Sequence, residues 1–127
     1  MKKRTHILMV DDDPDIRRIF GGYMAEMGLE IYYAHDGNRG REAARRLKPD
    51  LILMDVAMPV MDGMEAALRL KTEDVTKDIP IVMLTNFDLS IEAQQRLREF
   101  GVNTYLHKSV SMDEFRQTLK KHLKRSR

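Results

Sequence analysis

Short apolar runs alternate with amphipathic segments through all 127 residues of the chain. Each run is bounded by Gly, Pro or Asp, a pattern that is typical of β-strands. The segments between the runs repeat apolar residues at the spacing of one helix face. The alternation predicts strands over residues 5–10, 30–34, 51–55, 79–85 and 104–107.

The intervening segments also carry helix start and stop signals. Asp13 before Pro14 is a favourable N-cap followed by proline in the first helical turn, and Gly28 is expected to end that helix. Ser111 and Glu114 form the capping-box pattern of another helix. Apolar residues at helical spacing predict five helix faces: Ile16, Ile19, Phe20, Tyr23, Met24 and Met27; Gly40, Ala43, Ala44 and Leu47; Met64, Ala67 and Leu68; Ala93, Leu97 and Phe100; Met112, Phe115, Leu119 and Leu123.

Strands that alternate with helices in this way predict an α/β fold. The connections are then right-handed crossovers, which produce a doubly wound five-stranded parallel sheet with helices on both faces. The runs at 7–10, 51–54 and 81–84 are apolar throughout, so they belong in the middle of the sheet. The runs at 30–34 and 104–107 contain polar and tyrosine residues and suit the edges, which gives the strand order 2-1-3-4-5.

The composition excludes several classes of protein. There is no cysteine, which rules out disulfides, thiolate metal sites and cysteine nucleophiles. The apolar runs are too short to cross a bilayer and no signal-type segment follows the first residues, so we expect a cytoplasmic protein without membrane contact. Five basic residues lie after residue 119, leaving 17 basic against 20 acidic residues before it. This short tail is typical of a solvated helix end, and we do not expect nucleic acid as a partner.

Acidic residues gather where such a sheet binds ligands. In the order 2-1-3-4-5 the winding reverses between the first and third strands, and ligands bind beyond the carboxyl ends of strands at that point. Asp11, Asp12 and Asp13 follow the first strand and Asp55 ends the third. Asp13 is explained as a helix cap, but the other three acids predict a Mg²⁺ site and phosphoryl transfer, with Asp55 as the nucleophile.

Two further side chains are expected at the same edge. Thr85 ends the fourth strand and Lys108 follows the fifth, which adds a hydroxyl donor and a cation to the acids. Singly, either residue is commonplace: threonine is frequent in strands, and lysine is usually a solvated surface charge. Their placement on successive strands beside the acids favours a functional role.

These positions form a recognisable motif set: Val10-Asp11-Asp12, Asp55-Val56-Ala57-Met58-Pro59 followed by Met61-Asp62-Gly63, then Thr85, then Tyr105-Leu106-His107-Lys108. The set resembles the receiver domain of two-component response regulators, the CheY-like family with a flavodoxin-like fold. The resemblance implies a receiver domain over residues 4–124, with a basic tail at 125–127.

The resemblance implies a role for each matched residue. Asp55 would accept a phosphoryl group from a sensor histidine kinase or a phosphotransfer protein. Asp12, Asp55 and the backbone carbonyl of Ala57 would hold Mg²⁺, with Asp11 assisting through water. Lys108 and Thr85 would bind the phosphoryl oxygens, and Tyr105 would turn inward as Thr85 moves. Tyr105 also has a simpler interpretation as an edge-strand aromatic that packs on the sheet.

The sequence departs from the family pattern at two positions. After Thr85 the family usually has a very small residue, whereas this chain has Asn86, which would either crowd the phosphoryl pocket or add a donor to it. After Lys108 the family usually has a proline in a cis peptide, whereas this chain has Ser109, for which we expect a trans bond. Gly21-Gly22 in the first helix indicates a close approach or a bend.

The resulting prediction is a phosphorylation-activated signalling switch and not an enzyme acting on other substrates. Its output would be protein binding, to a downstream target or a second receiver, through the surface of the fourth helix, fifth strand and fifth helix near Leu97, Tyr105 and Phe115. One alternative is a receiver fragment of a longer DNA-binding regulator or hybrid kinase. An alternative from another class is a Mg²⁺-dependent aspartyl-phosphatase resembling haloacid dehalogenase-like enzymes, with Asp11 as the nucleophile.

Overall fold

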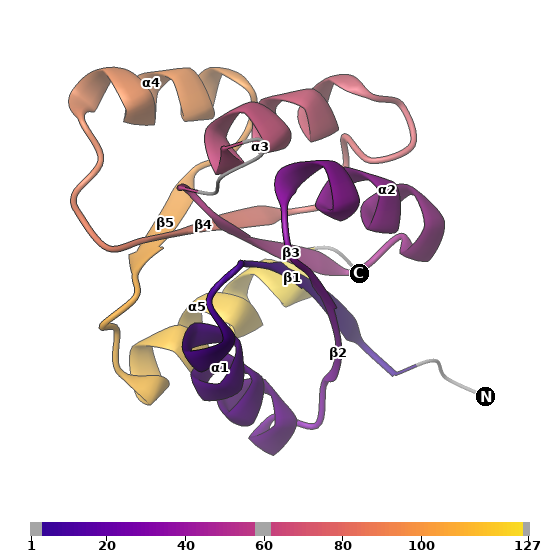
Figure 1. Ribbon diagram of the computed structural model, residues 1–127, viewed down its shortest axis with the longest axis vertical. Helices are drawn as coiled ribbons and strands as arrows, with labels where there is room; N and C mark the ends of the chain where they lie inside the picture. Colours follow the sequence, from indigo (N-terminus) through magenta and orange to yellow (C-terminus); the bar gives the residue numbers. More distant parts are fainter. Residues whose placement is uncertain (1–3, 58–61, 126–127) are drawn as a thin grey trace.

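The structure is a computed structural model that describes residues 4–57 and 62–125. It has five strands in one parallel sheet with the order β2-β1-β3-β4-β5, as predicted (Figure 1). The strands are β1 (His6–Val10), β2 (Glu30–Ala34), β3 (Leu51–Asp55), β4 (Ile81–Thr85) and β5 (Thr104–His107).

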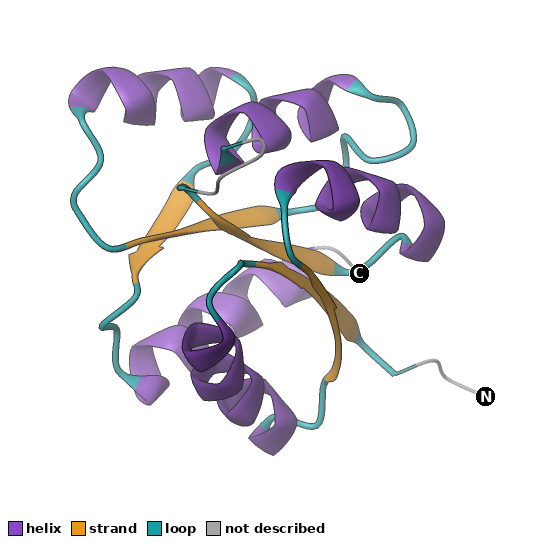
Figure 2. Ribbon diagram, viewed as in Figure 1, coloured by secondary structure: helices purple, strands orange, loops and turns teal. Residues whose placement is uncertain are grey.

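Five helices connect the strands and cover both faces of the sheet (Figure 2). One face is covered by α1 and α5, and the other by α2, α3 and α4. The chain is therefore the doubly wound α/β fold that the sequence predicts. The helices are α1 (Pro14–Glu26), α2 (Gly37–Leu47), α3 (Gly63–Thr72), α4 (Ile91–Glu99) and α5 (Met112–Arg125).

The helix starts depend on short polar side chains, because the first backbone N–H groups of a helix have no partner inside it. Asp13 Oδ1 accepts a hydrogen bond from the N–H of Asp15 at 2.9 Å, which confirms the predicted cap of α1. Ser111 Oγ accepts from the N–H of Glu114 at 3.1 Å at the start of α5. Gly28 has a φ of 76° directly after α1, a left-handed conformation that glycine adopts without strain.

The core consists of two apolar layers on either side of a fully buried centre. Every residue of β3 and β4 is buried, whereas the edge strands β2 and β5 are only partly buried. Phe20 of α1 and Phe115 of α5 pack against each other on one face, with ring centroids 4.9 Å apart. The rigid centre places the ends of β1, β3 and β4 in a fixed relation to one another.

The structure differs from the sequence predictions at the starts of two strands and at one helix position. β1 begins at His6 and not at residue 5. β4 begins at Ile81 and not at residue 79, because Pro80 has no N–H to donate and Ile79 instead donates to the carbonyl of Thr76 in a turn. Ile19 was placed on the apolar face of α1 but is 45% exposed. The predicted close approach at Gly21 is present, since a Cβ there would lie 2.3 Å from the hydroxyl of Tyr33.

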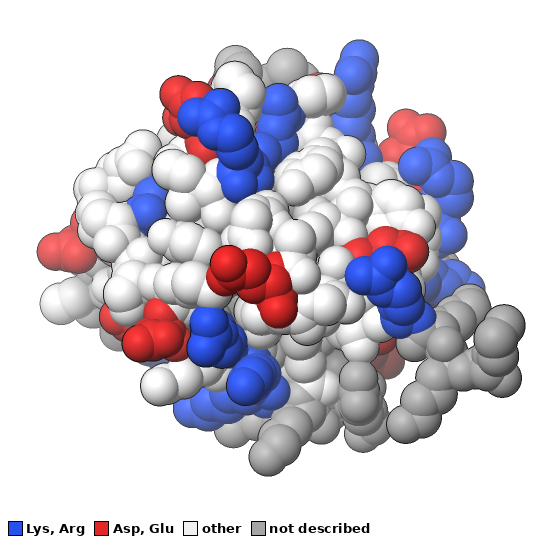
Figure 3. Space-filling model, turned by 90° about the horizontal axis from the view of Figure 1, so that it is seen from below, with Lys and Arg blue, Asp and Glu red and all other residues white. Residues whose placement is uncertain are grey.

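The outer surface of the α1 and α5 layer carries charges of both signs. Figure 3 views the molecule from this side and shows Lys and Arg side chains interspersed with Asp and Glu. Over residues 4–57 and 62–125, no helix has the length and apolar character needed to span a membrane.

Candidate functional site

Three carboxylates meet at the carboxyl edge of the sheet. Asp11 and Asp12 directly follow β1, and Asp55 is the last residue of the neighbouring strand β3. One carboxylate oxygen from each lies within 4.8 Å of the other two. Asp11 and Asp55 are buried, whereas Asp12 is exposed. The predicted convergence of these acids is thus present in the structure.

Lys108 partners the two buried acids. It directly follows β5, and its Nζ lies 3.1 Å from Asp11 Oδ2 and 3.1 Å from Asp55 Oδ1. The lysine side chain is only 6% exposed, so solvent screens these ion pairs weakly. With three carboxylates and one ammonium group, the cluster keeps a net negative charge.

Burial changes how these groups titrate. Burial and the neighbouring Asp11 carboxylate raise the pKa of Asp55 to about 6, although Lys108 acts in the opposite direction. Burial also lowers the pKa of Lys108, but its hydrogen bonds to Asp55 and Asp11 outweigh this and leave that pKa raised. The excess negative charge is therefore unfavourable, and an additional cation would relieve it.

The acid cluster also has unused ligand capacity. Asp11 Oδ1 accepts the N–H of Asp13 at 2.8 Å, and Asp11 Oδ2 has no partner among the described residues other than Lys108 Nζ at 3.1 Å. Carboxylate oxygens are the donors that Mg²⁺ prefers. These residues therefore fit a hard divalent cation.

Thr85 lies at the end of β4, beside these acids. Its Oγ1 donates to the carbonyl of Phe87 at 2.7 Å and accepts the N–H of Phe87 at 3.1 Å. The hydroxyl is consequently engaged within its own loop, although Thr85 is only 1% exposed. The hydroxyl can donate to a group on Asp55 only after its bond to the carbonyl of Phe87 breaks, because it has one O–H.

A small cavity of about 140 Å³ opens at this edge. Its walls come from the segments that follow β1, β3, β4 and β5, and are formed by Asp12, Asp13, Asp55, Val56, Ala57, Thr85, Asn86, Phe87 and Lys108. Ala57 donates its N–H to Asp55 Oδ1 at 3.4 Å, and residues 58–61 of the motif lie outside the described residues. The predicted acids, hydroxyl and cation therefore share one cavity, apart from Asp11, which contributes through Lys108.

The other predicted positions lie around this centre. Asn86 is exposed and lines the cavity, and Ser109 is exposed in the β5–α5 loop. Among the described residues every peptide bond is trans, as expected for Ser109. Tyr105 is half-buried and packs against the core on the α4 side. This position agrees with the packing interpretation of Tyr105, and its switch role stays a prediction.

Two residues at the site were missed by the sequence analysis. Phe87 is 54% exposed, yet it lines the cavity and holds the Thr85 hydroxyl. His107 Nε2 lies 2.9 Å from the carbonyl of Asn86, so it connects two loops. The only signal for Phe87 was an aromatic residue in a polar loop directly after a strand.

Two of the three residues that mark the predicted partner surface lie in the core, whereas the surface itself stays a prediction. Leu97 is 3% exposed and Phe115 is fully buried, so neither can contact a partner. The exposed apolar residues nearest the start of α4 are Phe87 and Ile91, which are 54% and 70% exposed. The reason is that Leu97 and Phe115 occupy the inward faces of their helices and fill the core.

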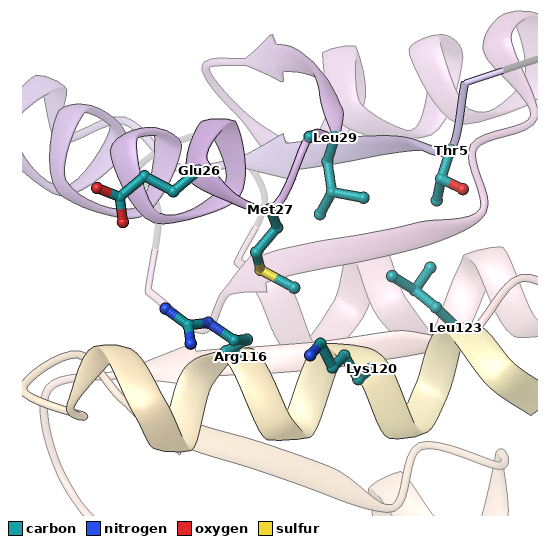
Figure 4. A pocket seen from close by; sticks show the side chains of 8 residues that line it. Thr5, Glu26, Met27, Leu29, Arg116, Lys120 and Leu123 are labelled. Carbon is teal, nitrogen blue, oxygen red and sulfur yellow. The ribbon is translucent and has the colours of Figure 1, made fainter.

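A larger cavity of about 660 Å³ lies between the end of α1 and one side of α5, from Arg116 to Leu123 (Figure 4). Met27 points toward α5 there, and Arg116 and Lys120 line the opposite side. This cavity contains none of the strand-end residues described above. It is spatially and chemically separate from the acid cluster.

Comparisons with known proteins agree with this site. The sequence model of the response regulator receiver domain matches residues 7–120. The chain is 30% identical over 117 residues to the polar-differentiation response regulator DivK of Brucella anthropi, covering 92% of this chain and 94% of that one. It is 33% identical over 122 residues to the DNA-binding regulator RpaA of Synechocystis, covering 94% of this chain but 49% of that protein.

Solved structures give the same result. The chemotaxis protein CheY4 of Vibrio cholerae is 30% identical, with a TM-score of 0.85 over 94% of this chain and 98% of that one. A receiver domain from Methanospirillum hungatei has a TM-score of 0.89 at 22% identity, over 98% of this chain and 97% of that one, and this likeness supports the fold. The chain belongs to the response regulator receiver domain family of two-component systems.

Proposed function

We propose that this receiver domain accepts a phosphoryl group on Asp55 in a Mg²⁺-dependent reaction and signals by changing a partner-binding surface. The observation that supports this most strongly is the placement of Asp55. Its carboxylate borders the cavity, lies 3.1 Å from Lys108 and belongs to a group of three acids that fits a divalent cation.

The two oxygens of Asp55 differ in their surroundings. Oδ1 is held by Lys108 and by the N–H of Ala57, whereas Oδ2 receives no hydrogen bond from the described residues. Oδ2 would attack the phosphorus of a phosphohistidine, forming a P–O bond while the P–N bond breaks and the imidazole takes up a proton. Lys108 then lies where it can bind the transferred oxygens.

Mg²⁺ would be held by Asp12, Asp55 and the carbonyl of Ala57, with Asp11 acting through water. When bound, it neutralises the charge on the transferred group and on the acids. The phosphoryl donor would be a sensor histidine kinase or a phosphotransfer protein. The chain would then be a cytoplasmic switch that catalyses no reaction beyond its own phosphorylation and dephosphorylation.

Phosphorylation would reach the surface through Thr85. The new phosphoryl oxygens favour a Thr85 rotamer in which the hydroxyl leaves Phe87 and turns toward Asp55. Phe87 is exposed and precedes α4, so its release changes the surface next to Ile91. We therefore place the partner surface on α4, β5 and α5, with Tyr105 turning inward as Thr85 moves. A downstream target or a second receiver would bind there.

The intact mass of the protein after incubation with acetyl phosphate and Mg²⁺ tests this function. We expect one phosphoryl adduct on the wild type, none on Asp55→Asn, and none when EDTA replaces Mg²⁺. Asp74→Asn is the matched control, because Asp74 is a highly exposed acid at the opposite edge of the sheet, between α3 and β4. Absence of an adduct on the wild type would contradict the proposal.

The same experiment discriminates the phosphatase alternative. In that model Asp11 is the nucleophile, but Asp11 is completely buried and lines no part of the cavity. An adduct that survives Asp55→Asn and disappears in Asp11→Asn would favour that alternative. The chain covers 49% of the DNA-binding regulator RpaA, so a receiver domain within a longer regulator stays among the proposals. The phosphorylation chemistry would be the same for a single receiver domain and for one within a longer protein.

A further inference from the structure

His107 bridges the two loops that flank the phosphoryl cavity. Its Nε2 lies 2.9 Å from the carbonyl oxygen of Asn86, in the β4–α4 loop. Its Nδ1 lies 3.1 Å from the backbone N of Ser109 and 2.7 Å from Ser109 Oγ, in the β5–α5 loop. The ring thus contacts one residue from each loop.

The donors determine which ring nitrogen carries the proton. The backbone N–H of Ser109 can only donate, so Nδ1 must accept. The carbonyl of Asn86 can only accept, so Nε2 must donate. A neutral imidazole protonated on Nε2 fits all three contacts, with the N–H and the hydroxyl of Ser109 sharing the single lone pair of Nδ1. A proline at position 109 would have no N–H for the bond to Nδ1, so this arrangement depends on Ser109.

The His107 ring holds the segment of the β4–α4 loop that has to move when the Thr85 hydroxyl turns toward Asp55. Asn86 lies between Thr85 and Phe87, and the Thr85 hydroxyl must stop donating to the carbonyl of Phe87 before it can donate to a group on Asp55. Lys108 lies between His107 and Ser109, and its N–H donates to the carbonyl of Thr85 at 2.8 Å. The His107 ring therefore fastens the backbone on both sides of the cavity.

We propose that His107 is a positioning residue that holds the β4–α4 loop in its resting arrangement and so sets how readily Thr85 reaches a phosphoryl group. This inference rests on the proposed function, because it concerns the same site. On this proposal the bond to Asn86 stabilises the resting arrangement more than the competent one, so its loss weakens the resting state. The competent arrangement then becomes more populated, and a phosphoryl mimic binds more tightly.

Two substitutions distinguish the hydrogen bond made by Nε2 from those made by Nδ1. In His107→Gln the side-chain amide nitrogen reaches the place of Nε2, so the bond to Asn86 is retained. In His107→Asn the shorter side chain reaches only the place of Nδ1, so it contacts Ser109 and leaves Asn86 free. His107 is exposed, so both variants and His107→Ala are expected to fold.

The test is a titration of the labelled full chain with beryllofluoride and Mg²⁺, followed by the backbone amide signals of Asn86 and Phe87. The half-saturating concentration should fall about two- to tenfold in His107→Ala and His107→Asn, the range expected for one net hydrogen bond. His107→Gln should stay within about twofold of the wild type. Equal half-saturation in all four proteins would overturn the inference.

A second readout needs no phosphoryl mimic. In the ligand-free protein at about pH 8, the imidazole nitrogen signals should report a single tautomer with the proton on Nε2. A tautomer protonated on Nδ1, or free exchange between the two, would refute the bridge. If the wild type fails to bind beryllofluoride, the proposed function fails, whereas the tautomer measurement still decides on His107.

Discussion

At the scale of single residues, Asp55 is a carboxylate that the fold holds in an unfavourable environment. Burial and the Asp11 charge raise its pKa from 3.8 to about 6. The folded chain therefore binds the Asp55 proton more tightly than the unfolded chain does, and this difference stabilises the fold at pH values below the unfolded pKa. The stabilisation is lost as the pH rises through the folded pKa of about 6.

Asp55→Asn should therefore stabilise the metal-free protein at neutral pH. We expect the free energy of unfolding at pH 7.5 to rise by about 1–3 kcal/mol, and the difference to vanish near pH 4. Urea unfolding in EDTA across this pH range measures the effect, and Asp74→Asn should show no such trend. A wild type that is the more stable protein at pH 7.5 would mean that the Lys108 ion pair outweighs burial.

Asn86 determines how much room the phosphoryl cavity offers. Its side chain lines a space of only about 140 Å³ and makes no hydrogen bond to a described residue. Asn86→Ala should therefore speed phosphorylation by acetyl phosphate by about threefold, equivalent to under 1 kcal/mol of barrier. The time course of adduct formation by mass measures this, with Asn103→Ala as control. A slower reaction would instead identify Asn86 as a donor to the phosphoryl group.

At the scale of secondary-structure elements, two glycines at helix positions have opposite requirements. Gly22 is exposed within α1, and a Cβ there would meet nothing within 4 Å. Gly63 begins α3, and a Cβ there would lie 1.7 Å from the backbone oxygen of Asp55. The end of β3 thus depends on the absence of a side chain at the start of α3.

Gly22→Ala should stabilise the protein by about 0.5–1 kcal/mol, because alanine has less backbone freedom to lose in a helix. Gly63→Ala should destabilise it by several times that amount and displace Asp55, lowering the yield of phosphoryl adduct. Thermal unfolding of the two variants measures the first effect and intact mass the second. A Gly63→Ala protein with normal stability and phosphorylation would disprove this view of the β3–α3 junction.

The elements that the sequence predicts well are those dominated by local pattern. Uniformly apolar runs identify β1, β3 and β4 as central strands, and polar and tyrosine residues identify β2 and β5 as edges. Parallel strands share one carboxyl edge, so Asp11, Asp12, Asp55, Thr85 and Lys108 could be placed together. The contacts of Phe87 and His107 could not be predicted, because the first depends on the conformation of the β4–α4 loop and the second on a hydrogen bond between two loops.

At the scale of the whole molecule, the acid cluster joins the ends of four strands, so ligand binding there is linked to the stability of the whole domain. Asp11 follows β1, Asp55 ends β3 and Lys108 follows β5, and two ion pairs of 3.1 Å join them. Thr85 ends β4 beside them. A ligand that binds this cluster only in the folded state stabilises the entire domain by mass action. The free energy of unfolding is therefore a measure of occupancy at the site.

Mg²⁺ should accordingly raise the free energy of unfolding by about 1.4 kcal/mol for each tenfold increase above its dissociation constant. The measurement is urea unfolding at increasing MgCl₂, with NaCl at matched ionic strength to remove general screening. Asp12→Asn should abolish most of the rise, because Asp12 is an exposed member of the cluster that the fold does not need. Asp74→Asn should keep the full rise.

The two variants make the result specific. Both remove one exposed carboxylate, so general charge effects are the same, and only Asp12 belongs to the three-acid group. A wild type that responds equally to MgCl₂ and NaCl would contradict the metal site. If MgCl₂ raised the free energy of unfolding of Asp12→Asn as much as that of the wild type, Asp12 would not be a metal ligand. The buried carboxylates of Asp11 and Asp55 would then have to bind the cation without a solvent-facing ligand.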